Sequence, residues 1–225
     1  MKMAVLGTGM VGKAHATGLI ELGYDVAMGT KDVETTKAND KPDNTAQSFS
    51  EWYKNNQKVK LMTFAEAADF GEVVVNALAG HVSVEVLKGL EGEIGDKILI
   101  DIANPLDFSK GMPPSLFVSN SDSLGEQIQA ALPKAKVVKL FNTTNATIQV
   151  NPKSLADGDH HIFISGNDAE AKAQAMDIAK SYGWENIIDL GDITMARGTE
   201  MFLPLWVRLW GALQTPNFNI KVVKG

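Results

Sequence analysis

The chain has 225 residues, of which 44% are hydrophobic and 21% charged, a composition that predicts a globular protein with one main core and an appendage. Its formal charge of −6 and the lack of any basic tract argue against nucleic acid or an anionic membrane as a general partner. No cysteine is present, which excludes disulfides, thiolate catalysis and cysteine-ligated metals, and we expect no metal site.

An apolar run over residues 3–6 leads into three glycines at G-x-G-x-x-G spacing. Gly7 permits a sharp turn, Gly9 lets the backbone approach a pyrophosphate, and Gly12 lets the next helix pack closely on the strand. The helical pattern continues to Gly23, so the stretch predicts a strand, a turn and a helix whose N-terminus binds the phosphates of a dinucleotide. We expect contacts to this dinucleotide from Gly7, Thr8, Gly9, Met10, Val11 and Gly12.

The end of the second predicted strand, at residues 24–29, bears on the choice of dinucleotide. An NAD site usually places Asp or Glu here to hold the ribose 2′-hydroxyl, whereas this chain reads Gly29-Thr30-Lys31. Without the carboxylate there is no repulsion of a 2′-phosphate, and Thr30 and Lys31 offer a hydroxyl donor and a positive charge to bind it. The pattern therefore favours NADP, although Lys31 can also be read as a solvated turn residue.

The next elements lead to a predicted crevice. We expect a short helix over residues 47–53, a strand over 59–62, a capping-box helix that begins at Thr63, and a buried strand with its exit loop over 72–80. The end of this fourth strand should lie across the crevice from the glycines, so Ala77 and Leu78 are expected to pack against the cofactor. His81 follows, and it either donates to a substrate or serves as a cap or solvated residue.

A fifth strand over residues 97–102 and a sixth over 136–141 complete the predicted sheet, with helices over 82–90 and 122–132 between them. Asn104 is placed to bind a nicotinamide carboxamide or a ribose hydroxyl, and Pro105 beside it is included in the cofactor site. The polar residues 142–145 contact the ligand or form turns and caps. Residues 1–150 are thus predicted to form a doubly wound, parallel α/β sheet of the Rossmann type.

Residues 151–225 are expected to form a small α+β domain for substrate or dimerisation, with strands over 162–166 and 187–190 and a helix over 169–182. His160 and His161 would point to opposite sides of a strand, which does not suit a chelating pair. A final helix over 195–213 is apolar on almost every side, but it is too short to span a bilayer and carries a charged residue midway. It packs in the core, or it leaves Trp206 and Trp210 for a second subunit or a pocket wall.

These motifs together resemble the NADP oxidoreductases that use a deazaflavin coenzyme, over nearly the whole chain. The resemblance rests on the glycine motif, on Gly29-Thr30-Lys31 where the family has Gly-Ser-Arg, on Asn104-Pro105-Leu106, and on residues 138–143. It implies a Rossmann domain with a small C-terminal domain, a homodimer, and hydride transfer between NADPH and a deazaflavin (coenzyme F420) lying over the nicotinamide. The oxidoreductase domains of membrane ferric reductases are similar too.

Hydride transfer between two ring systems needs alignment and exclusion of water more than an acid or base. The predicted strand ends show no evident carboxylate–histidine pair or buried lysine, so we assign no catalytic side chain. The acceptor can be a deazaflavin or a flavin. Two other functions stay open, a non-catalytic NADP-binding or sensing module and a reductase of a small carbonyl or imine. A strand that begins at residue 3 leaves no room for a signal peptide, so we expect a cytoplasmic location.

Overall fold

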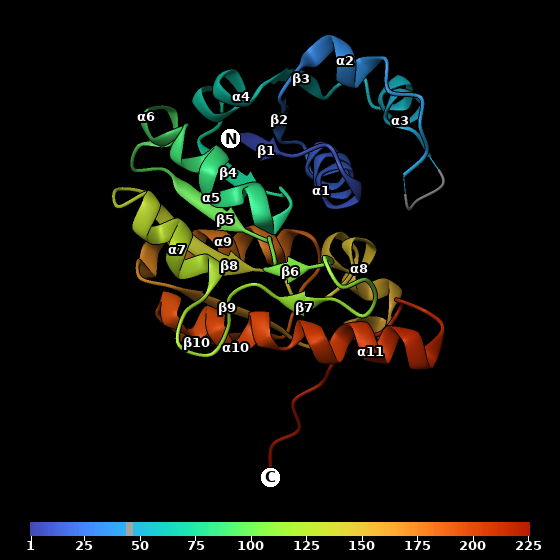
Figure 1. Ribbon diagram of the computed structural model, residues 1–225, viewed down its shortest axis with the longest axis vertical. Helices are drawn as coiled ribbons and strands as arrows, with labels where there is room; N and C mark the ends of the chain where they lie inside the picture. The colour runs from blue at the N-terminus through green and yellow to red at the C-terminus, as the bar shows by residue number, and fades with distance from the viewer. Residues whose placement is uncertain (44–46) are drawn as a thin grey trace.

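The computed structural model describes residues 1–43 and 47–225. In this part of the chain the main sheet has eight strands in the order β10-β9-β8-β5-β4-β1-β2-β3 (Figure 1). The strands are β1 (Lys2–Leu6), β2 (Asp25–Thr30), β3 (Lys60–Thr63), β4 (Val73–Asn76), β5 (Ile98–Asp101), β8 (Lys136–Leu140), β9 (Ile162–Gly166) and β10 (Ile187–Gly191). The first six in sequence are parallel, β9 runs antiparallel to β8, and β10 runs parallel to β9. The prediction of a doubly wound α/β fold is confirmed.

Helices cover both faces of the sheet because the central strands are apolar on both sides. One face packs against α1 (Met10–Glu21), α3 (Phe49–Asn55), α8 (Ala146–Val150) and α9 (Ala169–Ser181). The other face packs against α4 (Phe64–Phe70), α5 (Gly80–Lys88), α6 (Glu91–Ile94), α7 (Leu124–Ala131) and α10 (Ala196–Met201). The remaining elements are α2 (Val33–Lys37), α11 (Leu203–Leu213), the short strands β6 (Leu106–Asp107) and β7 (Ser115–Leu116), and three 3-10 turns at Pro152–Ser154, Ala156–Gly158 and Ile193–Met195.

The strand order reverses between β1 and β4, and this is where open α/β sheets bind ligands. The ends of neighbouring strands lie in register: Leu6 pairs with Asn76, Asn76 with Asp101, and Asp101 with Lys139, the next-to-last residue of β8. The segments that follow β1, β4, β5 and β8 therefore leave the sheet at one common edge. That edge carries the glycine motif and the predicted cofactor residues.

The second half of the chain differs from the sequence-based expectation in three ways. The strands β9 and β10 extend the main sheet and share its core. The domain boundary expected at residue 150 stays a prediction. The expected single helix over 195–213 is a 3-10 turn followed by α10 and α11, which are separated at Phe202, and Pro204 lies in the first turn of α11. The segment between β5 and α7 contains the antiparallel β6–β7 ribbon, which is not predicted from the sequence. Among residues 1–43 and 47–225, no helix combines the length and apolarity needed to cross a membrane.

Candidate functional site

The glycine motif forms a close-packed turn with an open outer side. Gly7 has φ +116°, in the region that favours glycine, and a Cβ atom there would overlap the Ala77 carbonyl. A Cβ on Gly12 would overlap the Gly7 carbonyl, so α1 lies directly against the turn. Gly9 is the N-cap of α1 without a side-chain cap, and a Cβ there would meet nothing within 4 Å. The N-terminus of α1 is therefore open to a ligand, and its N–H groups and dipole suit a pyrophosphate.

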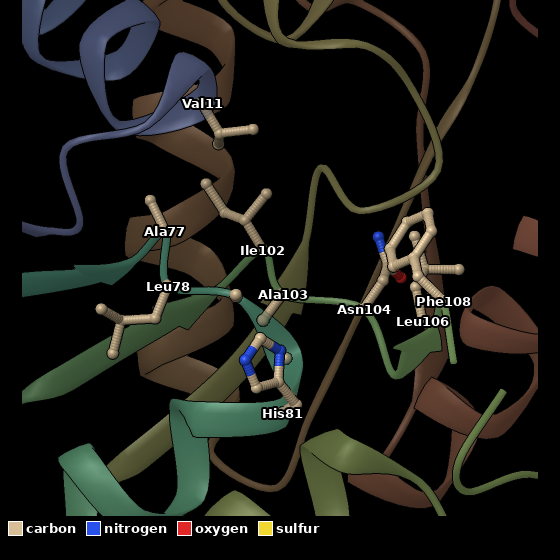
Figure 2. Close-up of a pocket in the computed structure, with 11 residues that line it drawn as sticks. Val11, Ala77, Leu78, His81, Ile102, Ala103, Asn104, Leu106 and Phe108 are labelled. Carbon is tan, nitrogen blue, oxygen red and sulfur yellow. The ribbon is translucent and has the colours of Figure 1, made fainter. Parts of the chain in front are cut away.

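A cavity of about 260 Å³ lies beside this turn (Figure 2). Val11 of α1 faces it from one side, Leu78 follows β4, and Ile102 and Asn104 follow β5. The backbones of these strand exits are in close contact, because a Cβ on Gly80 would overlap the Asn104 carbonyl. The full lining is Val11, Ala77, Leu78, Ala79, Gly80, His81, Ile102, Ala103, Asn104, Leu106 and Phe108. The predicted residues Val11, Ala77, Leu78 and Asn104 thus meet in one cavity, whereas Pro105 is buried and its carbonyl accepts a hydrogen bond from the Phe117 N–H.

The apolar lining continues into a second cavity of about 530 Å³. It shares His81, Leu106 and Phe108 with the first and adds Asp107 of β6 and Phe117, which directly follows β7. Phe108 and Phe117 are exposed aromatic residues at this site. Sequence reasoning missed both, because a two-stranded ribbon with strands of two residues leaves almost no periodic signal.

Thr30 and Lys31 lie at the carboxyl end of β2, next to the glycine turn, where the Gly29 carbonyl accepts a hydrogen bond from the Gly7 N–H. The Thr30 side chain is buried, and its hydroxyl already pairs with the Thr36 hydroxyl at 2.7 Å. Lys31 is exposed. The position leaves the Lys31 ammonium available to an anion, while the Thr30 hydroxyl is engaged within the protein.

The polar residues after β8 divide between positioning and capping. The Asn142 side chain donates to Asn104 Oδ1, and the Asn104 side chain donates to the Asn142 carbonyl, each at 2.9 Å. Asn145 instead caps α8 by accepting from the N–H groups of Thr147 and Ile148. Of Asn142 and Asn145, Asn142 is the one connected to the cavity, because its partner Asn104 lines it.

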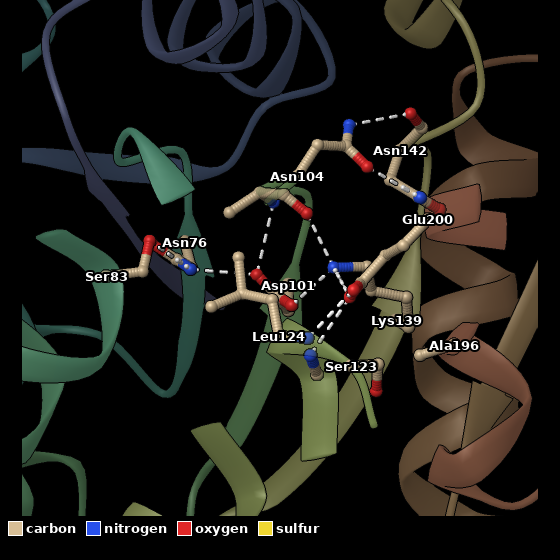
Figure 3. Close-up of polar contacts among 12 residues, drawn as sticks. Asn76, Ser83, Asp101, Asn104, Ser123, Leu124, Lys139, Asn142, Ala196 and Glu200 are labelled. Carbon is tan, nitrogen blue, oxygen red and sulfur yellow. Dashed lines mark hydrogen bonds and ion pairs between the residues drawn. The ribbon is translucent and has the colours of Figure 1, made fainter. Parts of the chain in front are cut away.

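A buried ionic cluster lies behind the cavity wall (Figure 3). The Lys139 ammonium is 2.8 Å from Asp101 Oδ2 and 2.7 Å from Glu200 Oε1, and it donates to the Ala103 carbonyl at 2.5 Å. All three charged side chains are at most 2% exposed. This corrects the expectation that no buried lysine is present near the strand ends. Lys139 is the next-to-last residue of β8 and pairs with Asp101 at the end of β5, so an alignment of the predicted strand ends could have indicated the contact.

The late helix does not line either cavity at the strand exits. Trp206 stacks on Phe218 of the C-terminal segment with ring centroids 5.2 Å apart, and Trp210 packs beside Trp206 at 5.8 Å. The aromatic wall expected from the sequence is instead supplied by the β6–β7 ribbon.

The fold, the glycine turn and the adjoining cavity define a Rossmann-type dinucleotide-binding oxidoreductase. Residues 2–105 match the model of the family described as NADP oxidoreductase, coenzyme F420-dependent. The chain is 52% identical to a provisionally named F420-dependent NADP reductase from Arthrobacter sp. FB24, with a TM-score of 0.95 over 100% of both chains. The chain belongs to the family of coenzyme F420-dependent NADP oxidoreductases.

Two more distant relatives match this chain at lower identity and over part of their length. The F420-dependent NADP reductase of Methanocaldococcus jannaschii is 30% identical over 145 residues, which is 64% of this chain and 64% of that protein. The metalloreductase STEAP3 of Rattus norvegicus is 26% identical over 210 residues, 91% of this chain and 38% of that protein. The chain therefore spans less than two thirds of the length of these two relatives.

Proposed function

We propose that the protein catalyses hydride transfer between NADP(H) and a flat redox acceptor, with the deazaflavin coenzyme F420 as the first candidate and a flavin as the second. The observation that carries the proposal is a pair of adjoining cavities with shared lining residues, which extend from the glycine turn past Leu78 to Phe108 and Phe117. The names of the Arthrobacter and Methanocaldococcus relatives support the same pair of reactants.

The residues at the sheet edge suit this chemistry. The open backbone at Gly9 and the N-terminus of α1 would hold the pyrophosphate, and Lys31 would bind the 2′-phosphate as a charge-assisted contact. When both reactants are bound, NADPH supplies the hydride and the acceptor receives it. The protein contributes alignment and a dry site, which Leu78, Ile102 and Phe108 provide through their apolar side chains.

The proposal is tested by NADPH oxidation with coenzyme F420, FMN or FAD as acceptor. Turnover is expected with F420, and a Phe117→Ala variant, altered in the second cavity alone, should bind NADPH normally while its turnover falls. If the protein binds NADPH but reduces none of these acceptors at any concentration, it is a binding or sensing module.

We also propose that the protein acts in the cytoplasm as a homodimer. The outer side of α11 exposes Leu205, Trp210 and Leu213, each between 41% and 54% accessible, and a second copy would cover this apolar surface. Light scattering at micromolar concentration should report a dimer. A monomer at that concentration would contradict the proposal.

A further inference from the structure

The buried cluster of Asp101, Lys139 and Glu200 contains two carboxylates and one ammonium. Figure 3 shows that it draws its members from β5, β8 and α10, which are far apart in the chain. Burial lowers the pKa of Lys139, but the two adjacent carboxylates outweigh this effect and raise the pKa above its ordinary value. The ammonium is therefore charged at neutral pH.

Asp101 is surrounded by hydrogen-bond donors. Its Oδ2 faces the Lys139 ammonium, and its Oδ1 accepts from the Asn76 side-chain amide at 2.8 Å and from the Ala103 N–H at 3.1 Å. A carboxylic acid would need an acceptor for its own proton, and each of these three partners donates. The geometry thus fits an ionised Asp101.

Glu200 is likewise surrounded by hydrogen-bond donors. Its Oε2 accepts from the Leu124 N–H at 2.8 Å, and its Oε1 accepts from the Gly125 N–H at 2.9 Å and from Lys139. Leu124 and Gly125 open α7, a helix of eight residues, so the positive end of its dipole also faces the carboxylate. Two ionised carboxylates and one ammonium leave a formal charge of −1, which the α7 dipole offsets only in part.

This charge lies one peptide unit behind the cavity wall. Ala103 lines the cavity, its N–H donates to Asp101, and its carbonyl accepts from Lys139. The described residues that line the cavity include no Asp, Glu, Lys or Arg, and His81 is the sole titratable side chain among them. An apolar wall of this kind screens a charge less than water does.

We infer that the cluster of Asp101, Lys139 and Glu200 makes the site selective for the oxidised nucleotide. The inference rests on the proposed function and on the nicotinamide ring lying in this cavity beside Asn104, the residue predicted to bind its carboxamide. The nicotinamide ring is positively charged in NADP⁺ and neutral in NADPH, so a net negative charge behind the wall stabilises the first relative to the second. Glu200 and Asp101 do not touch the ligand and act as specificity-determining residues through the field they create.

The same preference favours one direction of the reaction. The C–H bond of the bound NADPH breaks and its hydride, two electrons with one proton, forms a new C–H or N–H bond on the acceptor. The acceptor is reduced and becomes an anion that takes up a proton from water, while positive charge develops on the nicotinamide ring beside the cluster. The field of the cluster lowers the free energy of that product and of the transition state leading to it.

The test is a comparison of the dissociation constants of NADP⁺ and NADPH for the wild type and two neutralising variants, Glu200→Gln and Asp101→Asn. Each substituted amide keeps an oxygen that can accept a backbone N–H. For unit charges about 10 Å apart at an effective dielectric constant of about 20, Coulomb's law gives roughly a tenfold change in a binding constant. We expect NADP⁺ binding to weaken by about this factor and NADPH binding to change far less. Glu185→Gln, which removes an exposed carboxylate paired with Lys153, is the matched control and should change neither constant.

Three other outcomes are informative. A wild type that binds neither nucleotide would overturn the proposed function itself. If the wild type binds both nucleotides and the folded variants lose affinity for both equally, the cluster has a structural role and the inference is overturned. An unchanged ratio in either folded variant would overturn it as well, and Asp101→Asn supplies this measurement if Glu200→Gln does not fold.

Discussion

Asn104 and Asn142 form a reciprocal pair, in which each side-chain amide donates to the other residue at 2.9 Å. Asn104 follows β5 and lines the cavity, whereas Asn142 follows β8 and is buried. Because both hydrogen bonds use the Asn104 side chain, the pair fixes which way its amide faces. The remaining N–H and lone pair of that amide are then available to a ligand in one orientation only.

We predict that Asn142→Ala lowers the free energy of unfolding by roughly 1 kcal/mol, because Asn104 Oδ1 loses its donor. The Michaelis constant for NADPH should rise several-fold, since Asn104 can then rotate away from the ligand. Urea denaturation and steady-state kinetics measure the two effects. Wild-type kinetics in a destabilised variant would show that the pair does not orient the cofactor.

Two glycines of the motif should respond differently to substitution. Gly9→Val should weaken NADPH binding by roughly ten- to hundredfold, while the loss of unfolding free energy stays below about 1 kcal/mol, because no atom lies within 4 Å of the added Cβ. Gly12→Ala should instead destabilise the fold by roughly 1–3 kcal/mol or more, because its Cβ overlaps the Gly7 carbonyl. Isothermal calorimetry and thermal unfolding distinguish the two effects. Normal NADPH affinity in Gly9→Val would place the pyrophosphate elsewhere.

Local signals account for what the sequence could predict. The glycine motif, the apolar runs of β1 and β4, and the Thr63 capping box each lie within a few residues of chain. The direction of β9 could not be predicted, because a strand pattern is the same in either direction. Its pairing to β8 places the second half of the chain in the main sheet, which no local pattern encodes.

The cluster behind the cavity was missed for a related reason. Glu200 bonds to the N–H of Leu124 across 76 positions of sequence, and a single lysine or glutamate is most often a surface residue. Asp101 and Lys139 carry a stronger signal, because each is a charged residue in the last two positions of a buried strand. That signal becomes visible only when the strand ends are assumed to lie in register.

Lys31 is predicted to set the preference for NADP over NAD. A charge-assisted contact to the 2′-phosphate contributes about 1.5–3 kcal/mol, so Lys31→Ala should weaken NADP⁺ binding by about one to two decades and leave NAD⁺ binding unchanged. Lys37→Ala on the neighbouring α2 removes the same charge from a residue already paired with Glu34 and is the control. Equal affinities for the two nucleotides in the wild type would contradict the assignment of the 2′-phosphate site.

His15 should make stability depend on pH. Burial lowers its pKa to about 4, against an ordinary value of 6.5, although the hydrogen bond with Gln149 raises it. The Gln149 amide nitrogen donates to the carbonyls of Phe141 and Thr144, so its oxygen faces His15 and accepts from Nε2–H of the neutral ring.

Because the unfolded chain binds a proton more readily than the folded one between these pKa values, stability is highest above pH 6.5 and falls toward pH 4. The His15 contribution to this loss is about 3 kcal/mol at pH 4. Urea unfolding of the wild type and of His15→Gln between pH 4 and pH 6.5 measures this contribution, since the variant has no imidazole to take up a proton. Parallel pH profiles for the two proteins would contradict the prediction.

The last prediction concerns the acceptor. Phe117 lines the second cavity and directly follows β7, so Phe117→Ala removes an aromatic face from the acceptor side without touching the glycine turn. An aromatic contact contributes about 0.5–1.5 kcal/mol beyond its buried area, and we expect the Michaelis constant for F420 to rise roughly tenfold while NADPH binds as before. Leu22→Ala is the control, because Leu22 is an exposed apolar residue at the end of α1 that lines neither cavity and lies outside the α11 surface assigned to the dimer. A normal Michaelis constant for F420 in Phe117→Ala would contradict this placement of the acceptor.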